Sequence, residues 1–403
     1  MQSNYRKIGD FIQLVDVRNK DLEVSQLLGL SIRKIFIPSV ANTIGTNMKN
    51  YKIIRKGQFA CSIMQVRRDK KMPIALLQDF EEAIISQAYP VFEVIDENEL
   101  MPEYLMMWFS RSEFDRQATF YAVGGVRGSL EWEDFLDFEL PIPNLQKQQE
   151  IVNEYNTIVN RIKLNEKLNQ KLEETAQAIY KHWFVDFEFP NKDGKPYKSN
   201  GGKMVFNEEL EKEIPVGWEK SILIKVADII MGQSPKGESY NEKGNGELFY
   251  QGRTEFGFRF PSVKMYTTEP KRRAKKGNIL MSVRAPVGDL NIANNDCCIG
   301  RGIASLESKI NCNSFLFYLM NDVKNQFKVS NDEGTIFGSI TKDGLYEIEI
   351  LKATDKVIQS FNEIIKSIDN SISFNCEELF YLNQLKDLLL SKMSNIELGK
   401  EMV

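Results

Sequence analysis

The chain contains an internal repeat, because its last third resembles its second quarter. Gly128-Ser129-Leu130 lies 210 residues before Gly338-Ser339-Ile340, and further matches continue without a gap at this shift. Upstream, Lys56-Gly57-Gln58-Phe59 matches Lys276-Gly277-Asn278-Ile279 at a shift of 220. A drifting offset predicts two copies of one scaffold with loops of different length. Two copies on one chain favour a partner with two-fold backbone geometry, and duplex DNA is such a partner.

The length and composition of the chain allow two globular domains and additional elements. It has 403 residues, of which 42% are hydrophobic, so large cores can form and global disorder is not expected. The first residues have no apolar run of signal-peptide length, and no stretch approaches the roughly 18 apolar residues of a membrane span. We therefore expect a cytoplasmic protein without a membrane partner. The five cysteines have no C-x-x-C spacing and His182 is the only histidine, so no metal site is expected.

The net charge of −4 means that any surface for nucleic acid must be local, because domains that bind DNA are usually basic. The second copy has a basic run that contains Arg272, Arg273, Lys275 and Lys276. The corresponding region of the first copy has the basic run 67–71. Each run alone is equally consistent with a solvated face, but the recurrence in both copies favours a role in binding phosphates.

Each copy begins with a mixed region in which short runs of β-branched and aromatic residues are broken by Gly, Pro, Asn and Asp. Residues 58–64 and 277–283 are such runs and predict strands, whereas 102–110 and 314–321 have helical spacing. The predicted fold class is α+β, with two homologous domains, two long helices and a pseudo-two-fold arrangement. The predicted segments are a first domain at 1–145, a first long helix at 146–190, a linker at 191–215, a second domain at 216–354 and a second long helix at 355–403.

Each copy ends in a long helix whose apolar residues recur in alternating steps of four and three, which is the pattern of a coiled coil. Both patterns contain an asparagine at the same place, Asn165 and Asn375. A buried asparagine in such a seam reduces stability but can fix the register. The alternative is that each asparagine faces solvent. The residues that we expect to pair the helices are Ile158, Ile162, Asn165, Leu172, Ile179, Ile368, Ile372, Asn375, Leu382 and Leu389.

The length of the two helices bears on how far apart two domains could be held. Each is about 35 residues, which is about 52 Å at 1.5 Å per residue. One turn of B-DNA is about 34 Å, so helices of this length could separate two domains by about one turn. Antiparallel pairing would place the globular regions at opposite ends, and parallel pairing would bring both to one end. The heptad pattern alone leaves both arrangements open.

The sequence contains no convincing catalytic motif. No phosphate-binding loop of the form G-x-x-x-x-G-K-[S/T] is present. No two prolines are adjacent, whereas amino-methyltransferases of DNA usually hold the flipped base with an Asn/Asp-Pro-Pro-aromatic motif. His182 lies at the end of a predicted helix, where a charge or hydrogen-bond role is expected. The glycine-rich run 124–128 is interpreted as a tight turn, because only Gly128 recurs in the second copy.

Without catalytic motifs, the polar residues of the loops are candidates for recognition. Arginine reads guanine, and glutamine or asparagine reads adenine, through paired hydrogen bonds in the major groove. The lysine clusters would bind phosphates. The candidate DNA-binding residues are Gln65, Arg67, Arg68 and Arg127 in the first copy, and Gln251, Arg253, Arg259, Arg272, Arg273, Lys275, Lys276, Arg284 and Arg301 in the second.

A segment at the end of the first long helix resembles a known family. Residues 174–190, ETAQAIYKHWFVDFEFP, followed by KSNGGKM at 198–204, are similar to the specificity subunit of type I restriction–modification systems. Residues 140–143, LPIP, leading into QQEI at 148–151 strengthen the resemblance, which covers the whole chain. One departure is Lys386, which stands at a seam position of the second helix. It could extend to the surface or face a partner subunit.

The resemblance implies a division of labour between subunits. In that family each variable domain is a target recognition domain that reads one half of a bipartite sequence in double-stranded DNA. The helices pair antiparallel, set the unread spacer and dock two modification subunits, which bind S-adenosylmethionine and methylate adenine. Restriction (motor) subunits that use ATP and Mg join that assembly. The specificity subunit has no active site, so we expect neither catalysis nor a cofactor in this chain.

Two other functions are consistent with parts of the sequence. An enzyme that fuses restriction or methyl transfer to recognition would show turnover without partners. A structural coiled-coil adaptor without DNA binding would leave no pair of protected DNA patches in a footprint. The absent motifs oppose the first alternative.

Overall fold

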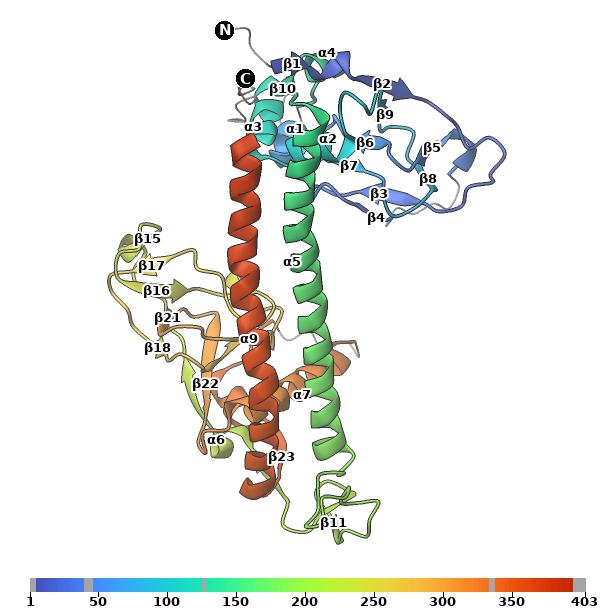
Figure 1. Cartoon of the computed structure of the whole chain (residues 1–403). Coiled ribbons are helices and arrows are strands. Elements are labelled where there is room, and N and C mark those ends of the chain that lie inside the picture. The colour runs from blue at the N-terminus through green and yellow to red at the C-terminus, as the bar shows by residue number, and fades with distance from the viewer. Residues whose placement is uncertain (1–4, 40–45, 125–127, 333–337, 394–403) are drawn as a thin grey trace, which may run out of the picture. The chain divides into compact units, whose positions relative to one another are not determined.

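The structure is a computed structural model that describes residues 5–39, 46–124, 128–332 and 338–393 (Figure 1). It divides into two compact units. The first comprises residues 1–163 and 380–403, and the second comprises residues 164–379. Both long helices, α5 (Leu145–Tyr180) and α9 (Asp355–Lys392), contribute one part to each unit. None of the helices in the described ranges combines the length and apolarity that a bilayer crossing requires.

The first unit is built on a four-stranded antiparallel sheet in the order β2-β9-β6-β7. Its core is aromatic: Phe59 of β6 stacks on Phe92 of β9 with ring centroids 5.0 Å apart, and Phe109 meets both rings edge-on. The strands are β1 (Tyr5–Lys7), β2 (Ile12–Val15), β3 (Leu28–Leu30), β4 (Phe36–Pro38), β5 (Lys52–Arg55), β6 (Phe59–Cys61), β7 (Ile74–Leu76), β8 (Glu82–Ile85), β9 (Val91–Val94) and β10 (Glu139–Pro141). The short helices are α1 (Val66–Asp69), α2 (Pro102–Phe109), α3 (Ser112–Tyr121) and α4 (Trp132–Leu136).

The second unit has a four-stranded antiparallel sheet in the order β14-β22-β19-β20 and a five-stranded sheet in the order β15-β17-β16-β21-β18. In the five-stranded sheet, β16 and β21 run parallel. The strands are β11 (Met204–Asn207), β12 (Lys212–Pro215), β13 (Glu219–Ile222), β14 (Ala227–Met231), β15 (Tyr240–Asn241), β16 (Glu247–Tyr250), β17 (Tyr266–Thr267), β18 (Arg273–Ala274), β19 (Ile279–Ser282), β20 (Leu290–Ile292), β21 (Cys297–Ile299), β22 (Ile303–Ser308) and β23 (Glu349–Lys352). The other helices are α6 (Leu223–Val226), α7 (Asn313–Asp332) and α8 (Lys342–Tyr346).

The two units share one strand topology, which explains the sequence repeat. The order β2-β9-β6-β7 in the first corresponds to β14-β22-β19-β20 in the second. In both, the first strand of the domain pairs with the strand that precedes the long helix, as β1-β10 and β13-β23. Gly57 and Gly277, which the repeat aligns, have φ of +86° and +88° before the equivalent strands β6 and β19. Glycine adopts this left-handed backbone without steric cost, so the aligned glycines mark the same turn. The predicted α+β class is confirmed.

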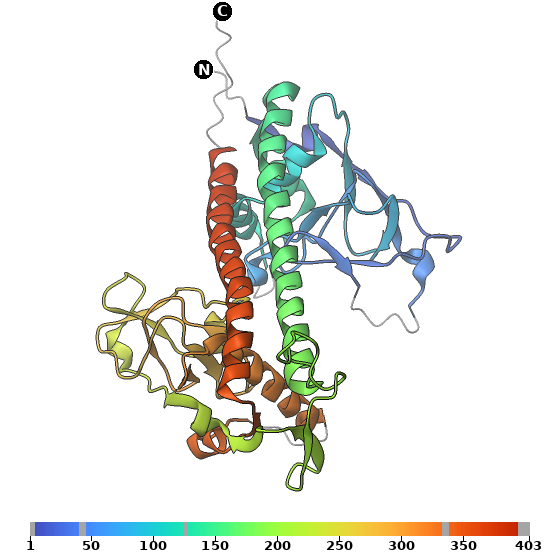
Figure 2. The ribbon, with the colours of Figure 1, turned by 60° about the horizontal axis from the view of Figure 1, so that its bottom comes forward.

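Within each unit, the segments of α5 and α9 lie side by side and run antiparallel (Figures 1 and 2). In the second unit, the side-chain amide of Asn375 donates to Oδ1 of Asn169 at 3.0 Å, and the ring centroids of Trp183 and Phe361 are 5.7 Å apart. Residue numbers therefore rise along one helix as they fall along the other. In the first unit, Leu390 of α9 joins the core that includes the start of α5. The parallel arrangement that the heptads left open does not occur within either unit.

The ten residues expected to pair the helices are all buried or half-buried. Asn165 is 2% exposed, and its side-chain amide donates to Oε2 of Glu378 at 2.8 Å. Asn375 is half-buried and bonds Asn169. The alternative in which both asparagines face solvent does not hold, because each has a polar partner on the other helix. Lys386 is half-buried and donates to Oδ1 of Asn383 at 3.1 Å, within its own helix.

The segment predicted as a linker at 191–215 is packed rather than extended. Helix α5 ends at Tyr180, and a π-helical turn at Lys181–Val185 follows it. Phe189 then stacks between Tyr197 and Trp218, with ring centroids 4.5 Å and 5.3 Å apart. Gly202 makes this fold possible, because a Cβ there would lie 2.3 Å from the ring of Tyr197. The composition of the segment did not reveal this aromatic stack.

Candidate nucleic-acid interface

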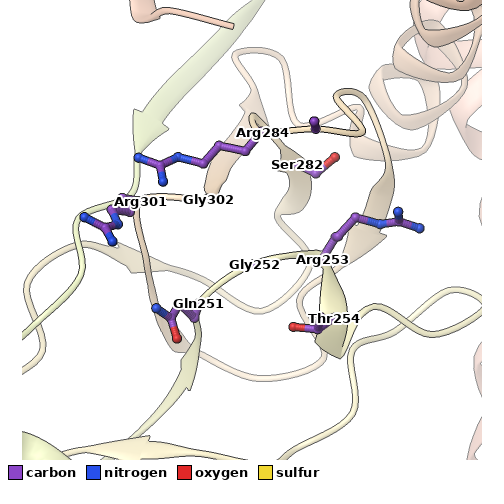
Figure 3. Close-up of a pocket in the computed structure, with 9 residues that line it drawn as sticks. Gln251, Gly252, Arg253, Thr254, Ser282, Arg284, Arg301 and Gly302 are labelled. Carbon is purple, nitrogen blue, oxygen red and sulfur yellow. The ribbon is translucent and has the colours of Figure 1, made fainter. Parts of the chain in front are cut away.

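A pocket in the second unit gathers four of the residues predicted to read bases. Gln251, Arg253, Arg284 and Arg301 line a hollow of about 240 Å³ (Figure 3). Three segments far apart in sequence supply them. Gln251 and Arg253 follow β16, Arg284 follows β19, and Arg301 follows β21. Thr254 and Ser282, which the sequence did not single out, also line it. The lining of the pocket thus includes three guanidinium groups and an amide.

Strand order explains why these residues meet. Because β16 and β21 are parallel neighbours, their carboxyl ends reach the same sheet edge and bring Gln251 and Arg301 together. The backbone N–H of Val283, at the end of β19, donates to the carbonyl of Gly302 at 3.0 Å, which adds Arg284 to the group. Gly300 is required by this close approach, since a Cβ there would lie 2.9 Å from Cα of Gln251.

The three arginines of the pocket differ in their partners. Nε of Arg253 lies 2.8 Å from Oδ2 of Asp289, and Nζ of Lys324 donates to Oδ1 of the same carboxylate at 2.7 Å. Arg284 and Arg301 are exposed, and within the described part of the chain neither forms an ion pair. Figure 3 shows their guanidinium groups on one side of the pocket and that of Arg253 on the other. Two planar donors are therefore free to meet an external acceptor.

The basic run of the second unit lies on the surface at β18. Arg272, Arg273, Lys275 and Lys276 are all exposed. Arg273 forms a forked ion pair with Glu247, with Nη2–Oε1 and Nε–Oε2 distances of 2.8 and 2.9 Å. Nζ of Lys275 is 3.8 Å from Glu307, whereas Arg272 and Lys276 form no ion pair with described residues. The run keeps a net positive charge, but two of its four cations are paired with carboxylates, which the sequence did not predict.

The prediction that Arg259 reads a base is wrong. Its side chain is 2% exposed, so it cannot reach DNA. Nη2 forms an ion pair with Glu173 of α5 and donates to the hydroxyl of Tyr318 at 2.8 Å, and Nη1 lies 3.5 Å from Oδ1 of Asp369 of α9. The guanidinium also stands 4.2 Å from the ring centroid of Phe317. Arg259 is thus a structural link between the second domain and both long helices.

The predicted residues of the first unit lie around the short helix α1. Arg67 and Arg68 are exposed on it, and Gln65 precedes it with φ of 64° and a half-buried side chain. Arg68 forms an ion pair with the adjacent Asp69 at 2.7 Å. Gly128 packs against Arg67, where a Cβ would lie 2.7 Å from Cβ of Arg67. Arg127 lies outside the described residues.

Asp289 is a residue of the pocket's surroundings that sequence reasoning missed. It holds Arg253, and its own backbone N–H donates to Oγ of Ser282 at 2.9 Å. The carboxylate thereby fixes one guanidinium relative to the pocket wall. A lone aspartate after a glycine has no distinguishing signal in the sequence, so the role becomes visible only once the chain folds.

Comparison with known proteins assigns the family. A family profile described as the type I restriction modification DNA specificity domain matches residues 34–174 and 215–379. A Methanocaldococcus jannaschii chain named as the MjaX specificity subunit of a type I restriction enzyme is 31% identical over 73% of this chain and 68% of its own. A Haemophilus influenzae chain, the HindI specificity subunit of a type I restriction enzyme, is 23% identical over 86% of this chain and 88% of its own.

The chain belongs to the type I restriction modification DNA specificity family. The two stretches that match the profile contain the whole four-stranded sheet of the second unit and all of the first unit's sheet except β2, so the repeat is a pair of DNA specificity domains. The crystal structure of a type I restriction–modification S subunit from M. genitalium has the same fold, with a TM-score of 0.59 at 16% identity over 97% of this chain and 95% of that one. The family predicted from residues 174–190 is confirmed, and the adaptor without DNA binding is not supported.

Proposed function

We propose that the domains at 1–145 and 216–354 each read one half of a bipartite sequence in double-stranded DNA. The observation that carries this proposal is the pocket in which Gln251, Arg284 and Arg301 converge from three strand ends. Exposed arginines that form no ion pair with described residues suit the O6 and N7 acceptors of guanine, and the amide of Gln251 suits adenine. Exposed cations on the basic run would bind the flanking phosphates and set the register of the domain on the duplex.

The chain performs recognition and leaves the chemistry to other subunits. Two modification subunits, with S-adenosylmethionine, would dock on the antiparallel helices, and restriction subunits would supply the ATP- and Mg-dependent steps. The named relatives support this division, because they are specificity subunits of type I restriction enzymes. The helices at 146–190 and 355–403 would then set the unread spacer, and 191–215 would join the first helix to the second domain.

The basic run gives a test of which surface faces DNA. In the assembled complex, replacing Arg272, Arg273, Lys275 and Lys276 by alanine should weaken DNA binding and flatten its salt dependence. Each lost phosphate contact lowers the slope of log K against log [salt] by about 0.9. Because Arg273 and Lys275 have carboxylate partners, we expect a total change nearer two contacts than four.

A matched variant controls for the loss of charge alone. The segment after α5 exposes four lysines, Lys192, Lys195, Lys198 and Lys203. Their replacement by alanine also removes four positive charges. Fluorescence anisotropy of a labelled duplex at several salt concentrations measures both slopes. Equal slopes for the two variants would show that the run at 272–276 does not face DNA.

A further inference from the structure

The first unit exposes an apolar side chain beside its basic residues. Phe120, in the last turn of α3, is 82% exposed, more than any other large apolar side chain whose burial the structure describes. Its neighbour Tyr121 meets it edge-on with ring centroids 5.4 Å apart and is 44% exposed. Val123, 58% exposed, follows. Single apolar residues at a surface are common, but a contiguous group of them indicates a contact surface.

Cations border this apolar group. Phe120, Lys70, Lys71 and Arg116 line one hollow of about 450 Å³. Lys70 and Lys71 form no ion pair with residues that the structure describes, whereas Arg116 pairs with Glu113 at 3.1 Å. Arg67 and Arg68, which the sequence predicts to bind DNA, lie on α1, and the two lysines directly follow this helix. Helix α1 packs against α3.

The carboxylates near the hollow are already engaged. Asp115 is buried, forms an ion pair with Lys34 at 2.8 Å, and accepts from the backbone N–H of Met72 at 3.1 Å. Asp69 pairs with Arg68 at 2.7 Å. The rim is therefore positive although the whole chain has a net charge of −4. This local excess is what an anionic partner would meet first.

The combination selects one class of partner. An aromatic ring inside a rim of cations fits duplex DNA, in which the phosphates attract the cations and apolar side chains contact base edges such as the thymine methyl or enter between base steps. We propose that Phe120 contacts a base in the half-site read by the first domain, while Lys70 and Lys71 bind the neighbouring phosphates. This inference rests on the proposed function. It adds Phe120 as a specificity-determining residue that acts through an apolar contact and not through hydrogen bonds.

Backbone hydrogen bonds connect the residues near Phe120 to α1. Val123 and Ser129 exchange backbone hydrogen bonds at 2.9 and 3.0 Å, and the N–H of Arg67 donates to the carbonyl of Gly128 at 3.3 Å. These bonds place Phe120 and the basic residues of α1 on one surface of the first unit. By contrast, the pocket of the second domain is lined by guanidinium groups, so the two domains would read their halves by different chemistry.

The test compares Phe120→Ala with Lys70→Ala/Lys71→Ala in the chain assembled with its modification subunits. Because loss of recognition at one base pair typically costs about 1–3 kcal/mol, affinity for the cognate duplex should fall about tenfold in Phe120→Ala with an unchanged salt slope. Phe120→Leu should retain part of the affinity. The double lysine variant should instead lower the salt slope by up to about 1.8. Scrambling the first half-site should abolish the difference between wild type and Phe120→Ala.

Three outcomes decide the matter. Unchanged cognate affinity in Phe120→Ala, with binding lost in Arg284→Ala, would overturn this inference and leave the proposed function intact. If neither variant affects binding, the proposed function itself fails. If Phe120→Ala weakens association with the modification subunits instead, measured by sedimentation velocity without DNA, the surface binds protein and the inference is wrong. Because the ring is exposed, the thermal midpoint of Phe120→Ala should match that of wild type and so exclude misfolding.

Discussion

Replacing Arg259 by leucine is expected to lower the free energy of unfolding by about 3–5 kcal/mol, because it leaves buried carboxylates without their cation. Glu173 and Asp369, from the two long helices, face this single guanidinium, and their side chains are only 17% and 18% exposed. Burial already raises the pKa of Asp369, an effect that the positive charge of Arg259 opposes. Burial also disfavours the charge on Arg259, but Tyr318 and Glu173 outweigh it and hold the pKa of the guanidinium above its ordinary value.

Urea denaturation followed by tryptophan fluorescence measures this effect, since Trp183 and Trp218 lie in the core of the second unit. Arg272→Leu is the matched control, because it removes an exposed arginine that has no ion pair with described residues. We expect the control to change the free energy of unfolding by no more than about 0.5 kcal/mol. A similarly small effect of Arg259→Leu would show that the buried cluster does not hold the second domain to the helices.

Replacing both Arg284 and Arg301 by alanine is expected to reduce affinity for the cognate duplex at least about thirtyfold. A bidentate contact from arginine to guanine is worth about 1–3 kcal/mol, so two such contacts account for about 2–6 kcal/mol. The loss should be confined to specific binding. Affinity for a duplex in which only the second half-site is scrambled should change little between wild type and variant, because the scrambled duplex no longer offers those acceptors.

The lysine variants separate charge from geometry. Arg284→Lys/Arg301→Lys keeps both positive charges but loses the planar fork that matches guanine. We expect this variant to retain non-specific binding and its salt slope while losing most of the discrimination between cognate and scrambled DNA. Competition binding with the two duplexes gives that ratio directly. Full discrimination by the lysine variant would mean that these residues contact phosphates rather than bases.

Periodicity and repetition predicted the parts of this fold that depend on local pattern. The heptad positions of Ile158 and Ile372 identified buried residues because seam burial follows from helix geometry, and the shared turn at Gly57 and Gly277 followed from the repeat. The pairing partners of Asn165 and Asn375 could not be read from the sequence. They depend on the register of one helix against the other, which the heptads alone leave open.

The candidate site was predicted in part, for a similar reason. Arg284 and Arg301 follow strands, and loop residues after strands gather at sheet edges, so selecting them by residue type located the pocket. Arg259 looked equivalent, but its carboxylate partner Glu173 lies 86 residues away and only folding brings the two together. Phe120 escaped notice because an aromatic residue with helical spacing is usually part of a core, and only its exposure distinguishes it.

The account rests on two domains that read DNA independently, and exchanging one domain tests this most directly. Residues 216–354 would be replaced by the second domain of another family member, and the methylated sequence would be determined in cells that contain the modification subunits. We predict that one half of the bipartite motif changes while the other half and the spacer length stay the same. A motif in which both halves change, or in which neither does, would contradict the account.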